Sequence, residues 1–435
     1  MSETVHETSY ETVHPLSSLQ ARLRVPGDKS LSHRSLIFGA LAQGKSEISG
    51  LLESEDVHST WRCLEGLGAR ISRQGELIFI EGLGREGLKA PDRELDCGNS
   101  GTTIRLLMGV LAGQPFASTL IGDASLTRRP MRRIAEPLRA MGAQIELREE
   151  NFAPVEISPA LLGGLDYALP VASAQLKSAL LLAGLFSSAP VTLRGEIASR
   201  DHTERLLPHF GVKLESGPGW LRIAPGQQLQ GSRFSVPGDP STAAFWLAAA
   251  AILPHAEVEI SGVSLNPSRL GFVRVLQRMG ARIELECQSE LPEPVGTIRM
   301  QSGSLQATSV SPEEIPDLID EVPLIAVLGA CALGRTIVHG AAELRIKESD
   351  RLEAVALNLR RMGAEIELFN DGFAVTGPQL LSGAEIDPHA DHRIAMAFAI
   401  AGLAASGPTR IHDPGCVAIS YPEFFTTLHA LKGSP

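Results

Sequence analysis

A short phrase recurs along this chain, and its spacing fixes the size of the folding unit. The phrase has the form Leu-x-x-apolar-Gly-Ala-x-apolar, with Val in place of Ala in one copy. Its glycines stand 69 to 83 residues apart, at Gly68, Gly142, Gly211, Gly280 and Gly363. Each copy has the pattern of an amphipathic helix, a glycine that ends the helix, and an alternating strand such as Gln144–Leu147. We expect a degenerate sixth copy at 428–433.

Two further elements recur with the same period, a helix that is apolar on every side and a short strand after it. The apolar helices are expected at Ser35–Ala42, Ile104–Ala112, Ser178–Phe186, Ala243–Ile252, Leu324–Leu333 and Ile394–Ala404. A helix without a polar face has to be buried all round. The unit is too long for a solenoid, whose repeats have roughly 20–45 residues. We therefore predict an α/β (α+β) fold of six units, with buried parallel helices under outer sheets.

Two similar turns mark where the chain passes between domains. Pro26-Gly27-Asp28 and Pro237-Gly238-Asp239 each precede an apolar helix, and three units separate them. We predict a lobe at 28–237 and a discontinuous lobe made of 1–27 and 238–435. The hinge is expected near 25–28 and 236–240.

Composition excludes several classes of protein. The 435 residues carry 39 Lys and Arg against 50 Asp and Glu, whereas a nucleic-acid-binding protein is usually basic. The five cysteines are scattered, which argues against a zinc site and a disulfide framework and favours a reducing compartment. Residues 1–20 lack the apolar core of a signal peptide, and the longest apolar run, 243–253, is too short to span a membrane. We expect a cytoplasmic monomer with no metal, no nucleic-acid partner and no membrane partner.

The starts of the apolar helices carry the residues that suggest a ligand. Lys29, Ser30 and Arg34 lie in the first turns of one helix, where free N–H groups and the helix dipole favour an anion. Small and neutral donors open the next two helices, at Gly98–Thr103 and Ser173–Gln175. Several positive helix ends in one place call for a ligand with several negative charges. No P-loop pattern occurs in the sequence, so ATP is not indicated.

Not every residue at these helix starts needs a function. Asp239 and Ser241 are interpreted as helix caps, and His33 and His202 as local hydrogen-bonding residues. Two acids are different, because Asp320 and Glu348 stand beside basic motifs. Both would stay ionised next to so many cations and could serve as bases. With Lys29 as an acid, protons could move on either side of a reacting carbon.

These motifs together resemble the enolpyruvyl transferases, and among them the EPSP synthases (3-phosphoshikimate 1-carboxyvinyltransferases). The matching stretches follow the family order from residue 25 to about 425: Pro26–Ser30 with Arg34, Gly98–Thr102, Arg129–Pro130, Ser173–Gln175, Arg200–Glu204, Lys347–Arg351 and Asp391–Arg393. The resemblance implies a fold of two lobes, each with three βαβαββ units, in an inside-out α/β barrel arrangement. It also implies that the enolpyruvyl group of phosphoenolpyruvate is transferred to the 5-hydroxyl of shikimate 3-phosphate, without metal or cofactor.

The resemblance assigns roles to individual residues. Shikimate 3-phosphate would be held by Lys29, Ser30, Arg34, Ser173, Gln175, Arg200, Asp320 and Lys347. Phosphoenolpyruvate would be held by Lys29, Asn99, Gly101, Arg129, Gln175, Arg351 and Arg393. Thr102, Ala174 and His392 lie in the same motifs and complete the predicted substrate-binding set. Asp320 is similar to the base at the hydroxyl, Glu348 to the acid and base at the methyl carbon, and Lys29 is the third predicted catalytic residue.

The chain departs from the family pattern at several positions. A lysine common near the C-terminus is missing from the segment 416–422, and Glu343 stands where some relatives have Asn. The Arg200–Glu204 stretch resembles glyphosate-tolerant forms, while Gly101 is typical of sensitive ones, and we predict sensitivity.

Two other functions remain open. A UDP-N-acetylglucosamine enolpyruvyl transferase would carry a cysteine in the loop 123–129, which has none here. A non-catalytic protein that binds polyanions would gain nothing from Asp320 and Glu348 facing its ligand.

Overall fold

The computed structural model describes residues 9–431, and their contacts divide the chain into two compact units. Unit 1 contains the described residues up to Val25, then Gly238–Ser289 and the chain from Pro294 onward. Unit 2 contains Pro26–Pro237 and the short segment Glu290–Glu293. The chain therefore passes between units at 25–26 and 237–238, and makes a brief excursion at 290–293 that the sequence did not suggest.

Unit 2 consists of three repeats, each with a four-stranded sheet. The sheets have the orders β14-β3-β5-β4, β6-β7-β9-β8 and β10-β11-β13-β12. In each sheet the first two strands are parallel and the other pairs are antiparallel. The second and third repeats follow the predicted βαβαββ order along the chain. The elements are α1 (Lys29–Leu41), β3 (Gln43–Ser49), α2 (Glu55–Gly66), β4 (Arg70–Gln74), β5 (Leu77–Leu83), β6 (Leu95–Asp96), α3 (Gly101–Leu111), β7 (Ser118–Ile121), η1 (Leu126–Arg128), α4 (Arg132–Ala140), β8 (Gln144–Arg148), β9 (Phe152–Ser158), β10 (Leu165–Leu169), α5 (Ala174–Gly184), β11 (Val191–Gly195), α6 (His202–His209), β12 (Leu214–Gly217), β13 (Trp220–Ile223) and β14 (Arg233–Ser235).

Unit 1 repeats this plan, with a smaller last sheet. Its sheets have the orders β2-β15-β17-β16, β18-β19-β21-β20 and β1-β23-β22. The elements are β1 (Tyr10–Val13), β2 (Gln20–Leu23), α7 (Pro240–Ile252), β15 (Glu257–Ser264), η2 (Pro267–Arg269), α8 (Gly271–Arg278), β16 (Arg282–Ser289), β17 (Val295–Gln301), β18 (Ser309–Val310), η3 (Ile315–Asp317), η4 (Ile319–Glu321), α9 (Val322–Cys331), β19 (Gly334–Val338), η5 (Ala342–Ile346), α10 (Arg351–Arg361), β20 (Glu367–Leu368), β21 (Phe373–Gly377), β22 (Glu385–Ile386), α11 (His392–Leu403), β23 (Thr409–His412), η6 (Pro414–Ile419) and α12 (Phe424–Ala430).

The strands just before the two crossings pair within the unit that the chain is about to leave. β2 precedes α1 in the chain, yet it pairs in parallel with β15 of unit 1. β14 precedes α7, yet it pairs in parallel with β3 of unit 2. Each crossing strand thus completes a sheet in the unit that it leaves, which ties the two ends of each unit together.

The sixth repeat is completed from the beginning of the chain. β1 pairs antiparallel with β23 and takes the place that a later strand holds in the other sheets. The sixth repeat ends on α12 at Ala430. The degenerate copy predicted at 428–433 therefore falls partly on this helix, and residues 432 and 433 lie outside the described part of the chain.

The glycines of the repeated phrase end their helices as predicted. All five have a positive φ, between 83° and 105°. A residue with a Cβ is strained in this conformation, so glycine is the residue of choice directly after a helix. The phrase is therefore a structural signature of the repeat.

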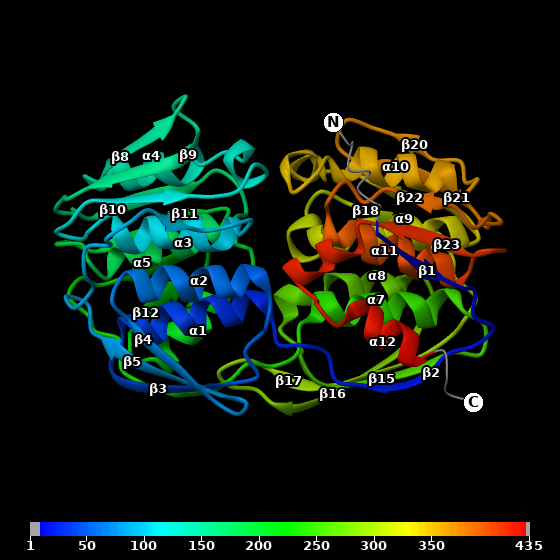
Figure 1. Ribbon diagram of the computed structural model, residues 1–435, viewed down its shortest axis with the longest axis horizontal. Helices are drawn as coiled ribbons and strands as arrows, with labels where there is room; N and C mark the ends of the chain where they lie inside the picture. Colours follow the sequence, from blue (N-terminus) through cyan, green and yellow to red (C-terminus); the bar gives the residue numbers. More distant parts are fainter. Residues whose placement is uncertain (1–8, 432–435) are drawn as a thin grey trace, which may run out of the picture. The chain divides into compact units, whose positions relative to one another are not determined.

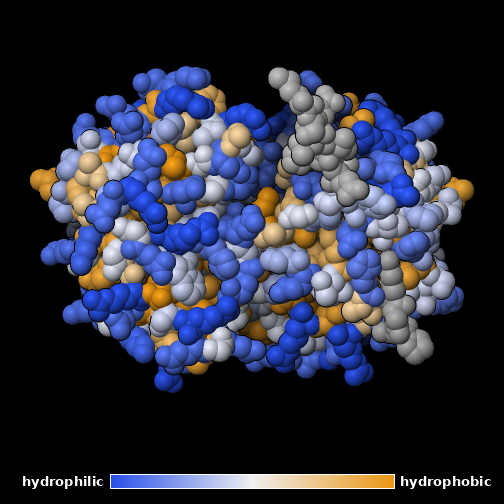
Figure 2. All heavy atoms as spheres, viewed as in Figure 1, coloured by the Kyte–Doolittle hydropathy of each residue, from blue (hydrophilic) through white to orange (hydrophobic). Residues whose placement is uncertain are grey.

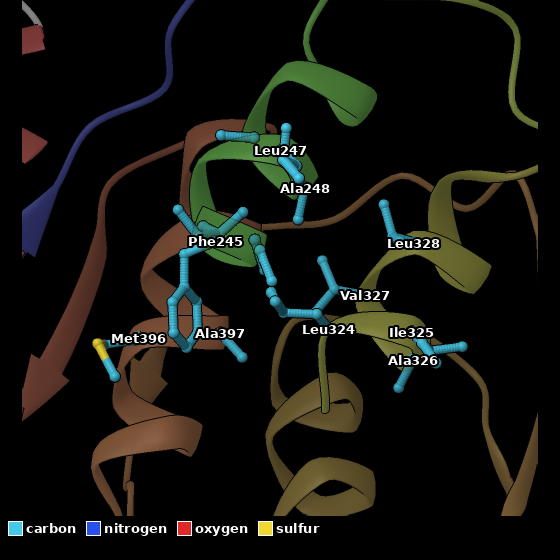
Figure 3. Close-up of a cluster of buried hydrophobic side chains, with 14 of the residues drawn as sticks. Phe245, Leu247, Ala248, Leu324, Ile325, Ala326, Val327, Leu328, Met396 and Ala397 are labelled. Carbon is cyan, nitrogen blue, oxygen red and sulfur yellow. The ribbon is translucent and has the colours of Figure 1, made fainter. Parts of the chain in front are cut away.

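The six apolar helices form the cores of the two units. In unit 2 they are α1, α3 and α5, and in unit 1 they are α7, α9 and α11 (Figure 1). All twelve residues of α11 are buried, and side chains from α7, α9 and α11, among them Phe245, Leu324 and Met396, lie together in the core of unit 1 (Figure 3). In unit 2 a Cβ on Gly109 of α3 would lie 2.2 Å from the carbonyl oxygen of Ala179 in α5, so this glycine permits close helix packing.

The sheets and the amphipathic helices cover these cores. On the face drawn in Figure 2 hydrophilic residues predominate, as expected when the apolar helices are inside. No helix within residues 9–431 is long and apolar enough to cross a membrane.

Candidate active site

The first turn of α1 places Lys29 beside an acid that the sequence did not single out. The Asp28 side chain caps α1 by accepting a hydrogen bond from the backbone N–H of Leu31 at 2.8 Å. Lys29 Nζ lies 2.9 Å from Oδ2 of Asp56, in the first turn of α2. Both side chains are largely buried, with 17% and 7% exposed. The ammonium group is therefore held in place by a neighbouring carboxylate.

Arg34, one turn further along α1, is buried among neutral groups. Its guanidinium donates to the Thr203 hydroxyl, the Ser178 hydroxyl and the carbonyl oxygen of Ser30, each at 2.8 Å. Burial lowers the pKa of Arg34 to about 10, although the more distant Glu204 and Asp28 act in the opposite direction. Because the direct partners of Arg34 are all neutral, its positive charge can still attract an anion.

Asn99 and Arg129 are joined in a relay that ends on Asp123. Arg129 Nη2 donates to Oδ1 of Asn99 at 2.7 Å and to the Ser125 hydroxyl at 3.0 Å. The Asn99 amide donates in turn to Oδ2 of Asp123 at 2.6 Å. The other carboxylate oxygen of Asp123 accepts from the backbone N–H groups of Ser125 and Leu126. Asp123 thus orients Asn99 so that its carbonyl faces Arg129.

The start of α5 is linked to the start of α3. Ser173 caps α5, accepting from the backbone N–H of Leu176 at 3.3 Å, and Ala174 is the first residue of this helix. Gln175 donates to the Thr102 hydroxyl at 3.1 Å and accepts from Arg105 at 2.9 Å. Gly101 opens α3, and a Cβ there would lie 2.8 Å from Nη1 of Arg105. The structure therefore brings Gly101, Thr102, Ala174 and Gln175 together.

Arg200 is half-buried and is followed by residues that are firmly held. Glu204 is 2.5 Å from Nζ of Lys177, which also donates to the carbonyl oxygens of Ile197 and Ser199. Burial raises the pKa of Glu204, and Lys177 partly counteracts it. His202 Nδ1 lies 2.7 Å from Oε1 of Glu293. His33 bonds to Thr60 at 2.7 Å, so both histidines are hydrogen-bonded within unit 2, although their partners are distant in the sequence and not local.

Unit 1 gathers its charged residues around Arg351, whose side chain is 1% exposed. Nε donates to Oδ2 of Asp391 at 2.7 Å, and Nη2 donates to Oε2 of Glu348 at 2.6 Å. Nη1 lies 3.4 Å from Oδ1 of Asp320. Burial alone would lower the pKa of Arg351, but Asp391, Glu348 and Asp320 outweigh it and raise this pKa above its usual value.

Arg393, at the start of α11, lies on the other side of Asp320. Its Nε is 3.6 Å from Oδ1 of Asp320, and its Nη1 is 3.9 Å from Oε1 of Glu321. Asp391 caps α11 by accepting from the backbone N–H of Arg393 at 2.9 Å. The structure thus brings Asp320, Glu348, Arg351 and Arg393 together, and Asp391 contacts both arginines, Arg351 through its side chain and Arg393 through its backbone N–H.

Comparison with known proteins shows the family of the chain. Residues 13–428 match the family described as EPSP synthase (3-phosphoshikimate 1-carboxyvinyltransferase). The chain belongs to the EPSP synthase family. A relative from Herpetosiphon aurantiacus, named 3-phosphoshikimate 1-carboxyvinyltransferase, is 48% identical over 97% of this chain and 99% of its own. One from Acidithiobacillus ferrooxidans, with the same name, is 49% identical over 95% of both chains.

Solved structures give the same result. EPSP synthase from Acinetobacter baumannii has a TM-score of 0.86 and 40% identity, and covers 97% of this chain and 98% of its own. The enolpyruvyl transferase NikO from Streptomyces tendae has a TM-score of 0.77 over 97% of both chains at 17% identity, and shows a shared fold. The resemblance drawn from the motifs is therefore confirmed, and so is the mixed α/β fold class.

In this EPSP synthase family member, two further predicted site residues differ in how deeply they are buried. His392 is completely buried at the start of α11, and Lys347 is half-buried between η5 and α10. The segment 416–422, which lacks the common family lysine, packs largely into the core, and Cys416, Val417 and Ile419 of η6 are buried. Burial is also the main reason why the pKa of the Cys416 thiol is raised.

Four acids near the predicted residues of this family member were missed by sequence reasoning as site residues: Asp56, Asp123, Glu293 and Asp391. Only Asp391 lay in a motif that carried the resemblance. Each of the others stands at a position where an acid is ordinary, such as the first turn of a helix or a loop. Among residues 9–431 no group of three or more His, Cys, Asp or Glu side chains is arranged to hold a metal ion.

Proposed function

We propose that this chain transfers the enolpyruvyl group of phosphoenolpyruvate to the 5-hydroxyl of shikimate 3-phosphate, in the shikimate pathway. One observation carries the proposal beyond family membership. Asp320 and Glu348 lie at 3.4 and 2.6 Å from the same buried guanidinium, that of Arg351. Two carboxylates around one cation can serve two proton transfers at neighbouring atoms of a bound anion. In a protein that only bound anions, these two carboxylates would lower the affinity for the ligand.

The reaction proceeds by addition and then elimination. Asp320 accepts the proton of the 5-hydroxyl as its oxygen bonds to the central carbon of phosphoenolpyruvate. Glu348, which is protonated once the two anions are bound, gives its proton to the methylene carbon, which becomes a methyl group. In the second step the methyl group returns a proton to Glu348, the bond from carbon to the phosphate oxygen breaks, and inorganic phosphate leaves with the proton that Asp320 had accepted. The enol ether remains on the 5-oxygen.

The cations and neutral donors hold the two substrates. Shikimate 3-phosphate contacts Lys29, Ser30, Arg34, Ser173, Gln175, Arg200, Asp320 and Lys347. Phosphoenolpyruvate contacts Lys29, Asn99, Gly101, Arg129, Gln175, Arg351 and Arg393. Thr102, Ala174 and His392 belong to the same motifs and to the proposed substrate-binding set. Charge-assisted hydrogen bonds from guanidinium and ammonium groups suit phosphate and carboxylate oxygens. The chain uses no cofactor, and it is sensitive to glyphosate.

We also propose that the chain works as a monomer in the cytoplasm. All five cysteines are free thiols in the structure, as a reducing compartment allows. Sedimentation of the purified protein at micromolar concentration tests the monomer, and a mass twice that of the chain would contradict it.

The deciding assay is phosphate release from phosphoenolpyruvate in the presence and absence of shikimate 3-phosphate. We expect release only when both are present, with an enolpyruvyl ether of shikimate 3-phosphate as the product by mass spectrometry. Release with UDP-N-acetylglucosamine instead would favour the sister activity. Binding of both substrates without any release would favour a polyanion-binding protein.

A further inference from the structure

The turn from Arg200 into α6 is held by an unusually complete set of side-chain contacts. Asp201 accepts from Nε of Arg205 at 2.8 Å. His202 bonds to Glu293, Thr203 accepts from Arg34 at 2.8 Å, and Glu204 pairs with Lys177. Each of the four residues after Arg200 therefore has a contact of its own.

Buried side chains contact the chain on both sides of Arg200. On one side Lys177, 1% exposed, donates to the carbonyl oxygen of Ser199 at 3.2 Å. On the other side His202 and Glu293 are 0% and 1% exposed, with Nδ1 and Oε1 2.7 Å apart. Because the residues before and after Arg200 are fixed, its backbone has little freedom to move. This is how a side chain is preorganised to meet a ligand.

Glu293 reaches this turn from a distant part of the sequence. It lies in the connection from β16 to β17, two strands of a unit 1 sheet, but by its contacts the segment Glu290–Glu293 is part of unit 2. Its neighbours Glu290 and Leu291 are exposed, Leu291 by 80%. A carboxylate is buried so completely only with a partner, because desolvation is costly. The contact with His202 helps to hold Glu293 in this buried position.

We propose that Glu293 is a positioning residue for the binding of shikimate 3-phosphate and acts through His202 on Arg200. Glu293 fixes the imidazole ring, and with it the first turn of α6. That turn sets the place of Arg200, two residues earlier, and of Thr203, which holds Arg34. The inference rests on the proposed function, because it takes Arg200 and Arg34 as ligands of shikimate 3-phosphate.

The test compares steady-state kinetics of full-length variants. Glu293→Ala should raise the KM for shikimate 3-phosphate about tenfold, which corresponds to one lost hydrogen bond to a ligand. The KM for phosphoenolpyruvate should stay within about twofold, because its predicted ligands are held by other contacts. Glu293→Gln keeps an oxygen that accepts from Nδ1–H, and should recover most of the loss. Glu290→Ala removes an exposed acid from the same segment and should leave both KM values unchanged.

A second background separates positioning from general damage. In Arg200→Ala, Glu293→Ala should raise the KM for shikimate 3-phosphate by less than about threefold, since most of its effect passes through Arg200. An unchanged KM in Glu293→Ala, or its full effect in the Arg200→Ala background, would overturn the inference. If Glu293→Ala does not fold, Glu293→Asp takes its place, and equal increases in both KM values would count against positioning.

The same assays keep the two proposals apart. If the unmutated chain releases phosphate with shikimate 3-phosphate and the Glu293 variants behave like it, only the role of Glu293 fails. If the unmutated chain releases no phosphate under these conditions, the proposed function fails, and the inference fails with it.

Discussion

The two units surround their buried arginines in opposite ways. In unit 2 Arg34 donates to two hydroxyls and a backbone carbonyl, so its direct partners are all neutral. In unit 1 Arg351 is in contact with three carboxylates, those of Asp391, Glu348 and Asp320. Both side chains are almost completely buried. The difference in partners, rather than in burial, therefore decides how each arginine behaves.

The pKa values of the two arginines express this contrast. Burial lowers the pKa of Arg34 to about 10, whereas the three acids overcome burial and raise the pKa of Arg351. Unit 2 thus presents positive charge that an incoming anion can neutralise. In unit 1 the charge of Arg351 is already neutralised. Its three carboxylates outnumber it, so they can also exchange protons. We infer that unit 2 mainly binds and that unit 1 mainly carries out proton transfer.

The largest effect should come from removing an acid of unit 1. Asp320→Asn keeps the shape of the side chain but removes the base, so kcat should fall about 10³-fold, or about 4 kcal/mol. Shikimate 3-phosphate should still bind within about tenfold, or about 1.4 kcal/mol, because the cations of unit 2 remain. Stopped-assay turnover and calorimetric titration give the two quantities.

A control for this variant lies outside the cluster. Asp317→Asn changes an acid three residues earlier, whose carboxylate pairs with Arg274 on the surface. Its turnover should match that of the unmutated chain. If Asp320→Asn weakened binding by orders of magnitude and left kcat unchanged, the division of labour would be reversed.

The second effect is the contribution of the acids around Arg351 to the stability of unit 1. Asp391→Ala removes both the helix cap of α11 and the acceptor of two hydrogen bonds from Arg351. Breaking a buried pair from one side costs about 3 kcal/mol. The urea midpoint of unit 1 should fall accordingly, whereas Glu284→Ala, at an exposed acid of β16, should change it little. An unchanged midpoint would mean that Glu348 and Asp320 suffice to hold Arg351.

Much of this architecture could be predicted from the sequence, because the repeats act locally. Five glycines at the same position of the repeated phrase define the unit, and helices with no polar face define its buried layer. Both signals are independent of the rest of the sequence. The pairing of β2 with β15 and of β14 with β3 could not be predicted, since a strand has the same sequence pattern in either sheet. Cations at helix starts pointed to a ligand, because several of them recurred.

The acids that contact these cations could not be predicted from the sequence, because they show no recurring pattern. Asp56 and Asp391 occupy the first turn and the cap of helices, where acids are common without any function. Glu293 lies ninety-one residues from its partner His202, so no local pattern connects them. Their role depends on tertiary contacts, which only the structure supplies.

The third effect tests binding in unit 2. Lys29→Met removes an ammonium group predicted to contact both substrates, so both dissociation constants should rise, each by roughly 30-fold, or about 2 kcal/mol. Titration of each substrate measures this directly. Lys45→Met, at an exposed lysine over the ring of Phe79, is the control and should bind normally. A loss of turnover with unchanged binding would mean that the predicted role of Lys29 as an acid holds and its predicted role in binding does not.

The smallest effect concerns the positive charge around His33 in unit 2. His33 is completely buried beside Lys29 and Arg34, and burial first, then these two cations, lower its pKa well below the usual 6.5. The folded state therefore keeps this imidazole neutral, while the unfolded chain takes up a proton below pH 6.5. Unfolding then binds a proton, so stability is lost as the pH falls, by about 1.4 kcal/mol for each unit below 6.5.

The variant His33→Asn isolates this contribution. Its amide can keep the contact with Thr60 but does not titrate, so its stability should fall less steeply than that of the unmutated chain between pH 6.5 and 5.5. Urea unfolding at these two values measures the difference, and His255→Asn, at an exposed histidine, should follow the unmutated chain. Equal slopes for His33→Asn and the unmutated chain would mean that His33 can be protonated in place. In that case unit 2 would tolerate a further cation beside Lys29 and Arg34, and its contrast with unit 1 would rest on geometry alone.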